Sequence, residues 1–330
     1  MEQKRKPHLR VAVTPECNFD CVYCRAGGEG LPSNGELMSS REIIEVVRIA
    51  SEIGFRYLKI TGGEPTLRRD LFRIIEGCSK LENLEEIQLA TNASRLTKEY
   101  VEGLKMTSLD SITISLDAAS REKFKEITKR DRFEKVISGI CTAREVGFPV
   151  TINSVIMQRN KGEVEGLIDI ARKTGSRIKL LDYIKVNDNG WEVEYLPFDQ
   201  LRKDLETRAE GVAWMCPPGG LGTPMPVYKI NGTEVIVKDA SIGTNYHETC
   251  NSCRNYPCQD ALISLRVTHD GKLKRCLIRD DSLVDVLNPL RSGNKEEVRK
   301  LIAESYRIFE ETKYQPNAWN HENEKHRIAQ

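Results

Sequence analysis

Three cysteines, Cys17, Cys21 and Cys24, lie within the eight residues CNFDCVYC near the start of the chain. A closed structural zinc site takes four ligands and a disulfide takes two, so three thiols on one short loop match neither arrangement. Three thiolates can instead hold three corners of a [4Fe–4S] cube and leave the fourth iron open to a ligand from outside the protein. The stretch therefore predicts an iron–sulfur centre with one open position. The alternative is a zinc site whose fourth ligand comes from a distant part of the chain.

A second group of cysteines follows much later and consists of Cys250, Cys253, Cys258 and Cys276. Four thiolates most simply hold a second [4Fe–4S] cluster with no open iron, and the alternatives are a four-cysteine zinc site or three ligands with a spare reactive thiol. Cys216, in the loop MCPPGG, could also enter the site. The chain has ten cysteines and no signal peptide, and in a reducing compartment such a number indicates metal binding or catalysis.

The overall composition is that of an ordinary globular protein and excludes some classes of partner. The 330 residues are 39% hydrophobic and 30% charged, and the formal net charge is +1. A charge this close to zero gives no general attraction to nucleic acid or to an anionic membrane. No apolar run is long enough to span a bilayer, and the N-terminal MEQKRKPHLR lacks the apolar segment of a signal peptide. We therefore expect a cytoplasmic protein with no membrane and no duplex nucleic acid among its partners.

The elements that must position these residues alternate between β-rich and helical segments from residue 9 to about residue 183. Such alternation predicts an α/β fold of parallel strands joined by right-handed crossovers, either doubly wound or curled into a partial barrel. In both arrangements the site lies at the carboxyl ends of the strands, where the cysteine loop follows the first strand and the loop GGEP follows the second. The six predicted strands are 9–13, 57–60, 86–91, 111–117, 150–157 and 177–184.

The sequence changes character after residue 185, where loops rich in Gly and Pro accompany two predicted hairpins. YKINGTEVIV and LRVTHDGKLKRCL each turn at an Asn-Gly or Asp-Gly pair between β-rich runs. A predicted terminal helix over KEEVRKLIAESYRIFEET follows them. We therefore predict two domains: a main α/β domain over residues 1–190, and a small cysteine-bearing β-hairpin module with a C-terminal helix over residues 191–330.

The loop GGEP is a second place where the residue types suggest a ligand. Gly62 and Gly63 let the backbone approach a ligand closely, and the carboxylate of Glu64 can face an ammonium group. Taken alone, the loop is more simply a tight turn from strand to helix. Together with the three cysteines at the preceding strand end, it predicts a ligand site shared by the two loops.

The cysteine spacing CxxxCxxC, the aromatic Tyr23 before the third cysteine and the GGEP loop resemble the radical S-adenosylmethionine (SAM) superfamily. From about residue 8 to about residue 290 the chain is similar to the GTP 3′,8-cyclase family of molybdopterin biosynthesis, in LRVAVTPECNFDCVYC, TGGEPTLRRDL, LATNASRL, ITISLD, INSVIM and LRVTHDGKLKRCL. This resemblance implies a partial (β/α)6 TIM barrel followed by a twitch- or SPASM-type auxiliary-cluster domain. It also implies a SAM-binding [4Fe–4S] cluster, reductive cleavage of SAM to a 5′-deoxyadenosyl radical, and a reductant such as flavodoxin or ferredoxin.

The resemblance also implies roles for individual residues, although it assigns no catalytic side chain. The positions that match SAM ligands are Tyr23, Gly62, Gly63, Glu64, Asn92, Ser115 and Asn153. Arg10 and Arg266 match nucleotide contacts, and Lys179 stands where an arginine is expected, so these three basic residues are predicted to bind an anionic substrate. The alternatives are polar residues that satisfy local backbone at strand ends, and basic residues that are solvated or paired at the surface.

Three features depart from the cyclase pattern. The second cysteine group has one cysteine more, Ser264 replaces the first arginine of a paired RxR, and the chain ends in KHRIAQ in place of a glycine tail. These departures argue against GTP cyclisation itself. We therefore predict hydrogen abstraction from an anionic nucleotide- or sugar-like small molecule, leading to oxidation, cyclisation or rearrangement. The alternatives are radical modification of a ribosomally made peptide, by crosslinking or epimerisation, and a non-catalytic zinc-stapled binding protein.

Overall fold

The computed structural model describes residues 8–25, 36–186, 190–217, 221–260 and 262–319, and within them twelve strands form one sheet and two more form a second. The strands are β1 (His8–Ala12), β2 (Tyr57–Thr61), β3 (Glu86–Thr91), β4 (Ser111–Ser115), β5 (Val150–Ile156), β6 (Arg177–Asp182), β7 (Gly211–Met215), β8 (Met225–Ile230), β9 (Thr233–Lys238), β10 (Gly243–Tyr246), β11 (Ser264–Val267), β12 (Lys272–Lys274), β13 (Val284–Asp285) and β14 (Lys313–Pro316). The helices are α1 (Ser40–Ile53), α2 (Leu71–Ser79), α3 (Lys98–Met106), α4 (Arg121–Thr128), α5 (Phe133–Glu145), α6 (Val164–Thr174), α7 (Trp191–Glu194), α8 (Asp199–Arg208), α9 (Glu248–Asn251), α10 (Leu287–Arg291) and α11 (Lys295–Glu310).

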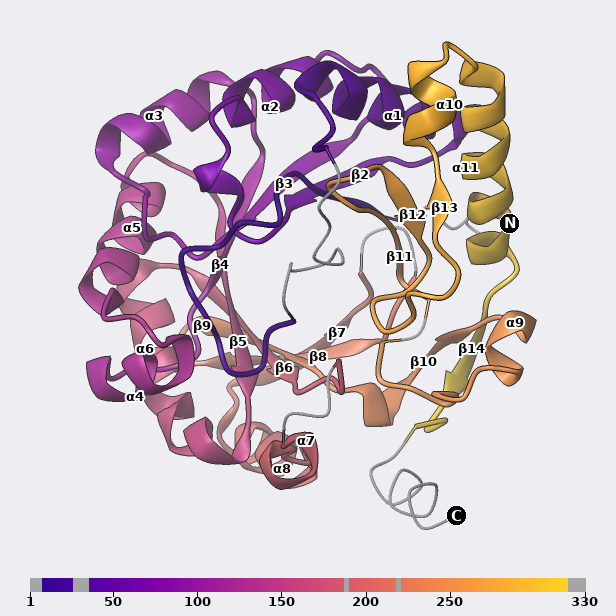
Figure 1. Cartoon of the computed structure of the whole chain (residues 1–330). Helices are drawn as coiled ribbons and strands as arrows, with labels where there is room; N and C mark the ends of the chain where they lie inside the picture. The colour runs from indigo at the N-terminus through magenta and orange to yellow at the C-terminus, as the bar shows by residue number, and fades with distance from the viewer. Residues whose placement is uncertain (1–7, 26–35, 187–189, 218–220, 261, 320–330) are drawn as a thin grey trace.

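Six parallel strands, β1 to β6, lie side by side in chain order at the centre of the larger sheet. The sheet curves, and helices α1 to α6 lie on its outer side (Figure 1). All six predicted strands are present, and their boundaries differ from the prediction by at most two residues. The predicted α/β class with a parallel sheet is therefore confirmed.

Side-chain alternation divides each of these strands between a helix-covered face and an inner face. In β1, Leu9 and Val11 are buried, whereas His8 and Arg10 alternate with them and line a cavity. The same alternation occurs in β6, where Lys179 lies between two buried aliphatic residues. Apolar burial against the outer helices therefore fixes which residues face inward.

The later hairpins extend both edges of this sheet, where a separate β module was expected. Strand β11 pairs in parallel with β1, and β9 pairs in parallel with β6. Each hairpin turns where predicted, with positive φ angles at Asn231, Gly232 and Gly271. An edge strand presents unpaired backbone groups, so the hairpins satisfy β1 and β6 by joining the sheet rather than packing elsewhere.

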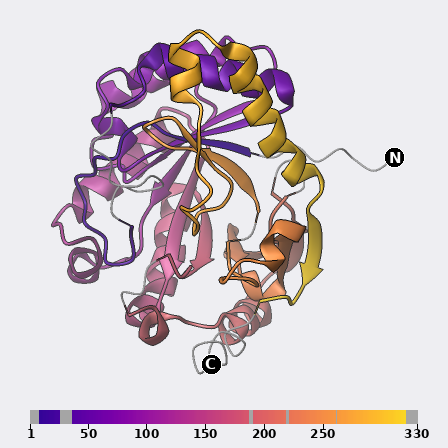
Figure 2. The same ribbon diagram turned by 45° about the vertical axis from the view of Figure 1, so that its right-hand side comes forward.

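The predicted terminal helix is α11, which lies beside α1 and leads down to β14 (Figure 2). Lys295 of α11 pairs with Glu45 of α1 at 2.8 Å, and Tyr306 packs edge-on against Phe55 with ring centroids 5.2 Å apart. Strand β14 then pairs with β10 in the two-stranded sheet. No helix in the described part of the chain is long and apolar enough to cross a membrane.

Candidate functional site

A row of basic residues crosses three neighbouring strands on the inner face of the sheet. The register places Arg10 of β1 opposite Lys59 of β2 on one side and opposite Arg266 of β11 on the other. All three line the same cavity. Like charges on adjacent strands repel, so such a row needs carboxylates or an anionic ligand to compensate it.

A second, mostly neutral row crosses β4, β5 and β6 and consists of Ser115, Asn153 and Lys179, again paired in register. The Oδ1 atom of Asn153 is buried and accepts no hydrogen bond from the described residues. Lys179 also forms no hydrogen bond or ion pair with any residue that the structure describes. A buried acceptor and a cation without partners are what a ligand would satisfy.

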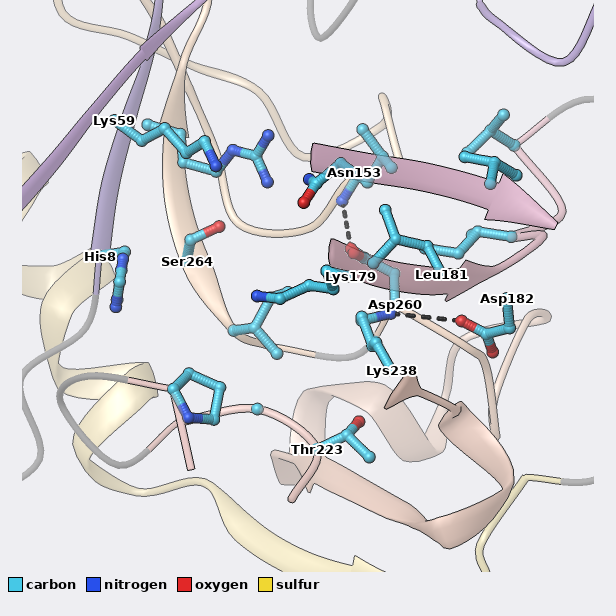
Figure 3. Close-up of a pocket in the computed structure, with 18 of the residues that line it drawn as sticks. His8, Lys59, Asn153, Lys179, Leu181, Asp182, Thr223, Lys238, Asp260 and Ser264 are labelled. Carbon is cyan, nitrogen blue, oxygen red and sulfur yellow. Dashed lines mark hydrogen bonds and ion pairs between the residues drawn. The ribbon is translucent and has the colours of Figure 1, made fainter. Parts of the chain in front are cut away.

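Both rows line one cavity of about 520 Å³, in the size range of small-molecule sites (Figure 3). Of the predicted site residues, those that line it are Arg10, Tyr23, Cys24, Gly62, Ser115, Asn153, Lys179 and Arg266. Arginine and lysine side chains around the cavity outnumber carboxylates: Arg10, Arg25, Lys59, Lys179, Lys238 and Arg266 face Asp182 and Asp260. This excess of positive charge suits an anionic ligand.

Lys179 lies among other positive charges. Burial, together with the positive charges of Arg177, Lys238 and Arg10, lowers the pKa of Lys179 to about 8. Strands β1 and β6 are separated by four strands in the sheet, yet Arg10 of β1 and Lys179 of β6 line the same cavity, so the sheet curves around it. Lys238, by contrast, has a carboxylate partner, with its Nζ 3.6 Å from Asp182 Oδ1 (Figure 3).

Arg266 is already paired within the protein. Its Nη2 lies 3.1 Å from Asp260 Oδ1, and the two side chains are 1% and 2% exposed. The second carboxylate oxygen of Asp260 accepts the Leu277 N–H at 2.6 Å. Separating a buried ion pair of this kind costs about 3–5 kcal/mol, so the predicted substrate contact of Arg266 competes with its partner.

The first cysteine loop lies at the carboxyl end of β1 and is tied to the end of α4. The backbone N–H groups of Asp20 and Val22 donate to the carbonyls of Thr128 and Ile127, at 3.1 and 3.0 Å. Burial raises the pKa of each of the three thiols, and the Cys21 thiol also feels the negative charge of the other two. The three thiols therefore lie near one another, and they would release protons on binding a metal.

The GGEP loop packs backbone to backbone against the cysteine loop, and this contact explains its glycines. Gly63 N–H donates to Thr14 O and Glu64 N–H donates to Glu16 O, both at 2.7 Å. A Cβ at Gly63 would lie 2.2 Å from the Glu16 carbonyl oxygen, and one at Gly62 would lie 2.6 Å from that of Thr14. The packing of the two loops therefore requires glycine at both positions. A ligand that approaches Gly62 from the cavity would be a second reason for glycine there.

The carboxylate of Glu64 accepts four hydrogen bonds inside the protein. Its donors are the Thr66 N–H and hydroxyl, at 3.0 and 2.5 Å, the Thr91 hydroxyl at 2.6 Å and the Asn92 N–H at 2.7 Å. Burial raises the pKa of Glu64 despite these donors, and its side chain does not line the cavity. The structure thus gives this carboxylate partners other than the ammonium group we expected, and it joins the ends of β2 and β3.

Two more of the predicted SAM ligands brace the cysteine loop. Asn92 donates through Nδ2 to Asn18 Oδ1 at 2.8 Å. The Tyr23 hydroxyl donates to Asp117 Oδ2 at 2.6 Å, and Asp117 Oδ1 accepts the Val155 N–H at 2.8 Å. Burial raises the pKa of Asp117 to about 6. Tyr23 lines the cavity and Asn92 does not.

The second cysteine group is assembled from separate segments. Cys250 lies in α9 and its carbonyl accepts the Cys253 N–H at 2.9 Å, Cys258 follows on the next loop, and Cys276 lies just after β12. The Arg279 N–H donates to Cys276 Sγ at 3.4 Å, and the Arg279 guanidinium feels the charges of Cys253 and Cys276. Tertiary structure therefore brings these cysteines to the same region, whereas the exposed Cys216 does not line the cavity.

The donor set bears on the predicted kinds of metal centre. Both cysteine groups offer thiols, which are the donors that hold a [4Fe–4S] cluster. No three of the His, Cys, Asp and Glu side chains in the described segments are arranged to hold a single metal ion. The residues present therefore fit an iron–sulfur cluster at each group.

Comparison with known proteins agrees with this geometry. The radical SAM superfamily profile matches residues 11–171. The chain is 34% identical over 305 residues to a probable GTP 3′,8-cyclase of Methanococcus maripaludis, covering 88% of this chain and 91% of that protein. It is 33% identical over 304 residues to a probable GTP 3′,8-cyclase of Saccharolobus solfataricus, covering 88% and 89%. This chain belongs to the radical SAM superfamily. It is therefore an enzyme that uses SAM and a [4Fe–4S] cluster.

Solved structures agree at the level of the fold. Streptococcus suis SuiB has a TM-score of 0.62 at 17% sequence identity, covering 86% of this chain and 64% of that chain. The protein anSMEcpe with bound AdoMet has a TM-score of 0.60 at 18% identity, covering 88% and 82%. At these identities the likeness supports the radical SAM fold and carries no substrate information.

The cavity contains charged residues that the sequence analysis did not name, among them Arg25, Lys59, Lys238 and Asp260. A signal for Lys59 was available, because a lysine in the middle of the strand YLKIT interrupts an otherwise apolar pattern. No local pattern pointed to Asp260, whose partners, Arg266 and the Leu277 N–H, lie 6 and 17 residues further along the chain.

Proposed function

We propose that the first cysteine loop binds the SAM-cleaving cluster and that the enzyme abstracts a hydrogen atom from an anionic small molecule held in the adjoining cavity. The observation that carries the substrate class is Lys179, a cation without a protein partner among the described residues, in a cavity rich in positive charge. The cluster would supply one electron for the cleavage of SAM to the 5′-deoxyadenosyl radical. The protein's own residues would bind and orient SAM and the substrate, and they would exclude water from the cavity.

The proposed roles follow from the cavity wall. Asn153 Oδ1 would accept a hydrogen bond from SAM, beside Ser115 and Gly62, and Lys179 would pair with a substrate oxyanion. The curved sheet would be the partial (β/α)6 barrel of residues 1–190, and residues 191–330 would hold the auxiliary cluster on Cys250, Cys253, Cys258 and Cys276. The relatives named GTP 3′,8-cyclase support a nucleotide-like substrate. Ser264 and the paired Arg266 favour one different from GTP.

A peptide substrate is the second candidate, and the edge strand β7 favours it. Val212 and Trp214 are 46% and 61% exposed on this strand, which is last in the sheet, and the next residue, Met215, lines the cavity. An extended peptide can add to such an edge through backbone hydrogen bonds.

Anaerobic reconstitution with iron and sulfide tests the proposal. Two clusters predict about eight irons per chain. With SAM and reduced flavodoxin or ferredoxin, 5′-deoxyadenosine should form, and candidate nucleotides and sugar phosphates should accelerate its formation in the wild type but not in Lys179→Met. Acceleration by peptides alone would select the second candidate. Failure of fully iron-loaded protein to cleave SAM would overturn both.

A further inference from the structure

Arg25 connects the two cysteine loops. It directly follows Cys24, the last cysteine of the first loop, and its Nη1 donates to the carbonyl of Leu277 at 3.0 Å. Leu277 directly follows Cys276 of the second group. The Nη2 of Arg25 pairs with Asp280 in the same segment. The guanidinium of Arg25 therefore links the residue after Cys24 to the segment that follows Cys276.

The Leu277 segment is held from its other side as well. The Leu277 N–H donates to Asp260 at 2.6 Å, so the backbone of this residue is clamped through both its N–H and its carbonyl. Asp280 also accepts the Lys274 ammonium at 2.6 Å, and the Lys274 side chain is 1% exposed. Arg25 is itself 16% exposed and lines the cavity, as Leu277 does.

We propose that Arg25 is a positioning residue that fixes the Cys276 loop against the Cys24 loop across the cavity. The proposal rests on the proposed function in one respect, that the two loops hold clusters. The planar guanidinium suits this task because it donates in two directions at once, whereas a lysine offers a single point charge. Arg25 lies beyond the last residue of the matched cysteine motif, so the motif does not account for it.

Arg25 matters more for the position of the Cys276 loop than for that of the Cys24 loop. The first loop keeps its backbone hydrogen bonds to α4 and to the GGEP loop whether or not Arg25 is present. The Leu277 carbonyl and the Asp280 carboxylate, in contrast, each lose a charged donor when Arg25 is removed. Loss of Arg25 should therefore loosen the auxiliary site and leave the SAM site in place.

The test compares Arg25→Met, Arg25→Lys and the control Arg279→Met in reconstituted holoenzyme. Arg279 is the same residue type near Cys253 and Cys276, but its ion-pair partner, Asp281, lies in its own loop. In Arg25→Met, about half of the iron should pass to a chelator about tenfold faster, as loss of a charged hydrogen bond predicts. The remaining iron should pass to the chelator within about threefold of the wild-type rate.

Spectroscopy identifies which cluster is affected. The electron paramagnetic resonance signal that SAM perturbs should be unchanged in Arg25→Met, the other signal should shift, and Arg25→Lys should recover part of the shift. Wild-type iron release and an unshifted second signal in Arg25→Met would overturn the proposal. So would equal loosening of both clusters, or an equal effect of Arg279→Met. A wild-type protein that takes up no iron would instead refute the proposed function.

Discussion

The two cysteine loops are built by different means. The first is contiguous, and backbone hydrogen bonds from α4 and from the GGEP loop hold it at the end of β1. The second draws its cysteines from separate segments and depends on buried charged side chains, among them the pair Arg266–Asp260. Backbone contacts tolerate almost no added volume, whereas an ion pair fails when one partner is removed. The two loops should therefore be sensitive to different kinds of substitution.

The largest effect is expected at the backbone contact of the first loop. Gly63→Ala would place a Cβ 2.2 Å from the Glu16 carbonyl oxygen, which belongs to the backbone and cannot move aside locally. We expect a loss of about 4–5 kcal/mol in the free energy of unfolding, together with loss of SAM cleavage. Urea denaturation measures the first quantity. The control is Gly162→Ala, where an added Cβ meets nothing within 4 Å. Equal stability of the two variants would contradict the claim that backbone packing holds the first loop.

The corresponding change near the second cysteine group removes one charge of the buried pair Arg266–Asp260. Arg266→Met leaves Asp260 buried without its cation and should cost about 3–5 kcal/mol. About half of the iron should be lost, while SAM-dependent formation of 5′-deoxyadenosine persists. The double variant Arg266→Met/Asp260→Asn should recover part of the stability, because no uncompensated charge remains. If Arg266→Met raised only the substrate KM, the residue would be a substrate contact, as the sequence had predicted.

The next prediction concerns the hydrogen bonds that the Glu64 carboxylate accepts beside the first loop. Glu64→Gln replaces a carboxylate oxygen with an amide donor opposite N–H and hydroxyl donors, and should destabilise the protein by about 1–3 kcal/mol. The loss should appear in the absence of SAM, because the partners are within the protein. Thermal unfolding with and without SAM separates a role of Glu64 in stability from a role in SAM binding. If Glu64→Gln had normal stability but bound SAM more weakly, the result would support a contact between the Glu64 carboxylate and the SAM ammonium group.

A fourth effect, which changes with pH, concerns the cavity cation. The pKa of Lys179 is about 8 in the folded protein, against about 10.4 in an unfolded chain. Between these values the unfolded state binds a proton that the folded state lacks, so stability rises with pH by up to about 1.4 kcal/mol per unit. Below the folded pKa the cost of burying the charge is fully present. Lys179→Met should therefore be more stable than wild type near neutral pH, with an advantage that shrinks above about pH 8. Denaturation curves at several pH values measure this difference, and a constant offset would contradict it.

The sequence predicted the parts of the molecule that depend on short stretches of chain. The six parallel strands, both hairpin turns and the terminal helix occur where expected, because alternation, turn residues and helix periodicity are local properties. The radical SAM superfamily was also identified correctly from the cysteine spacing and GGEP.

What the sequence missed depends on contacts between distant segments. The pairing of β11 with β1 and of β9 with β6 extends the sheet at both edges, and no pattern inside those hairpins predicts it. Arg266 was predicted to contact substrate, but it pairs with Asp260, which also accepts the N–H of Leu277, 17 residues further along the chain. The glycines of GGEP were assigned to ligand approach, and the structure adds the packing of two protein loops. The ligand roles of individual residues remain predictions.

The most direct test of this account measures 5′-deoxyadenosine in two matched cysteine variants. Reconstituted Cys24→Ala and Cys276→Ala would be reduced in the presence of SAM, beside the wild type, and the product quantified together with bound iron. We predict that Cys24→Ala forms none and retains the auxiliary cluster. Cys276→Ala should still cleave SAM after losing about half of its iron. Product from Cys24→Ala, or its absence from Cys276→Ala with an intact first cluster, would contradict the assignment of separate roles to the two loops.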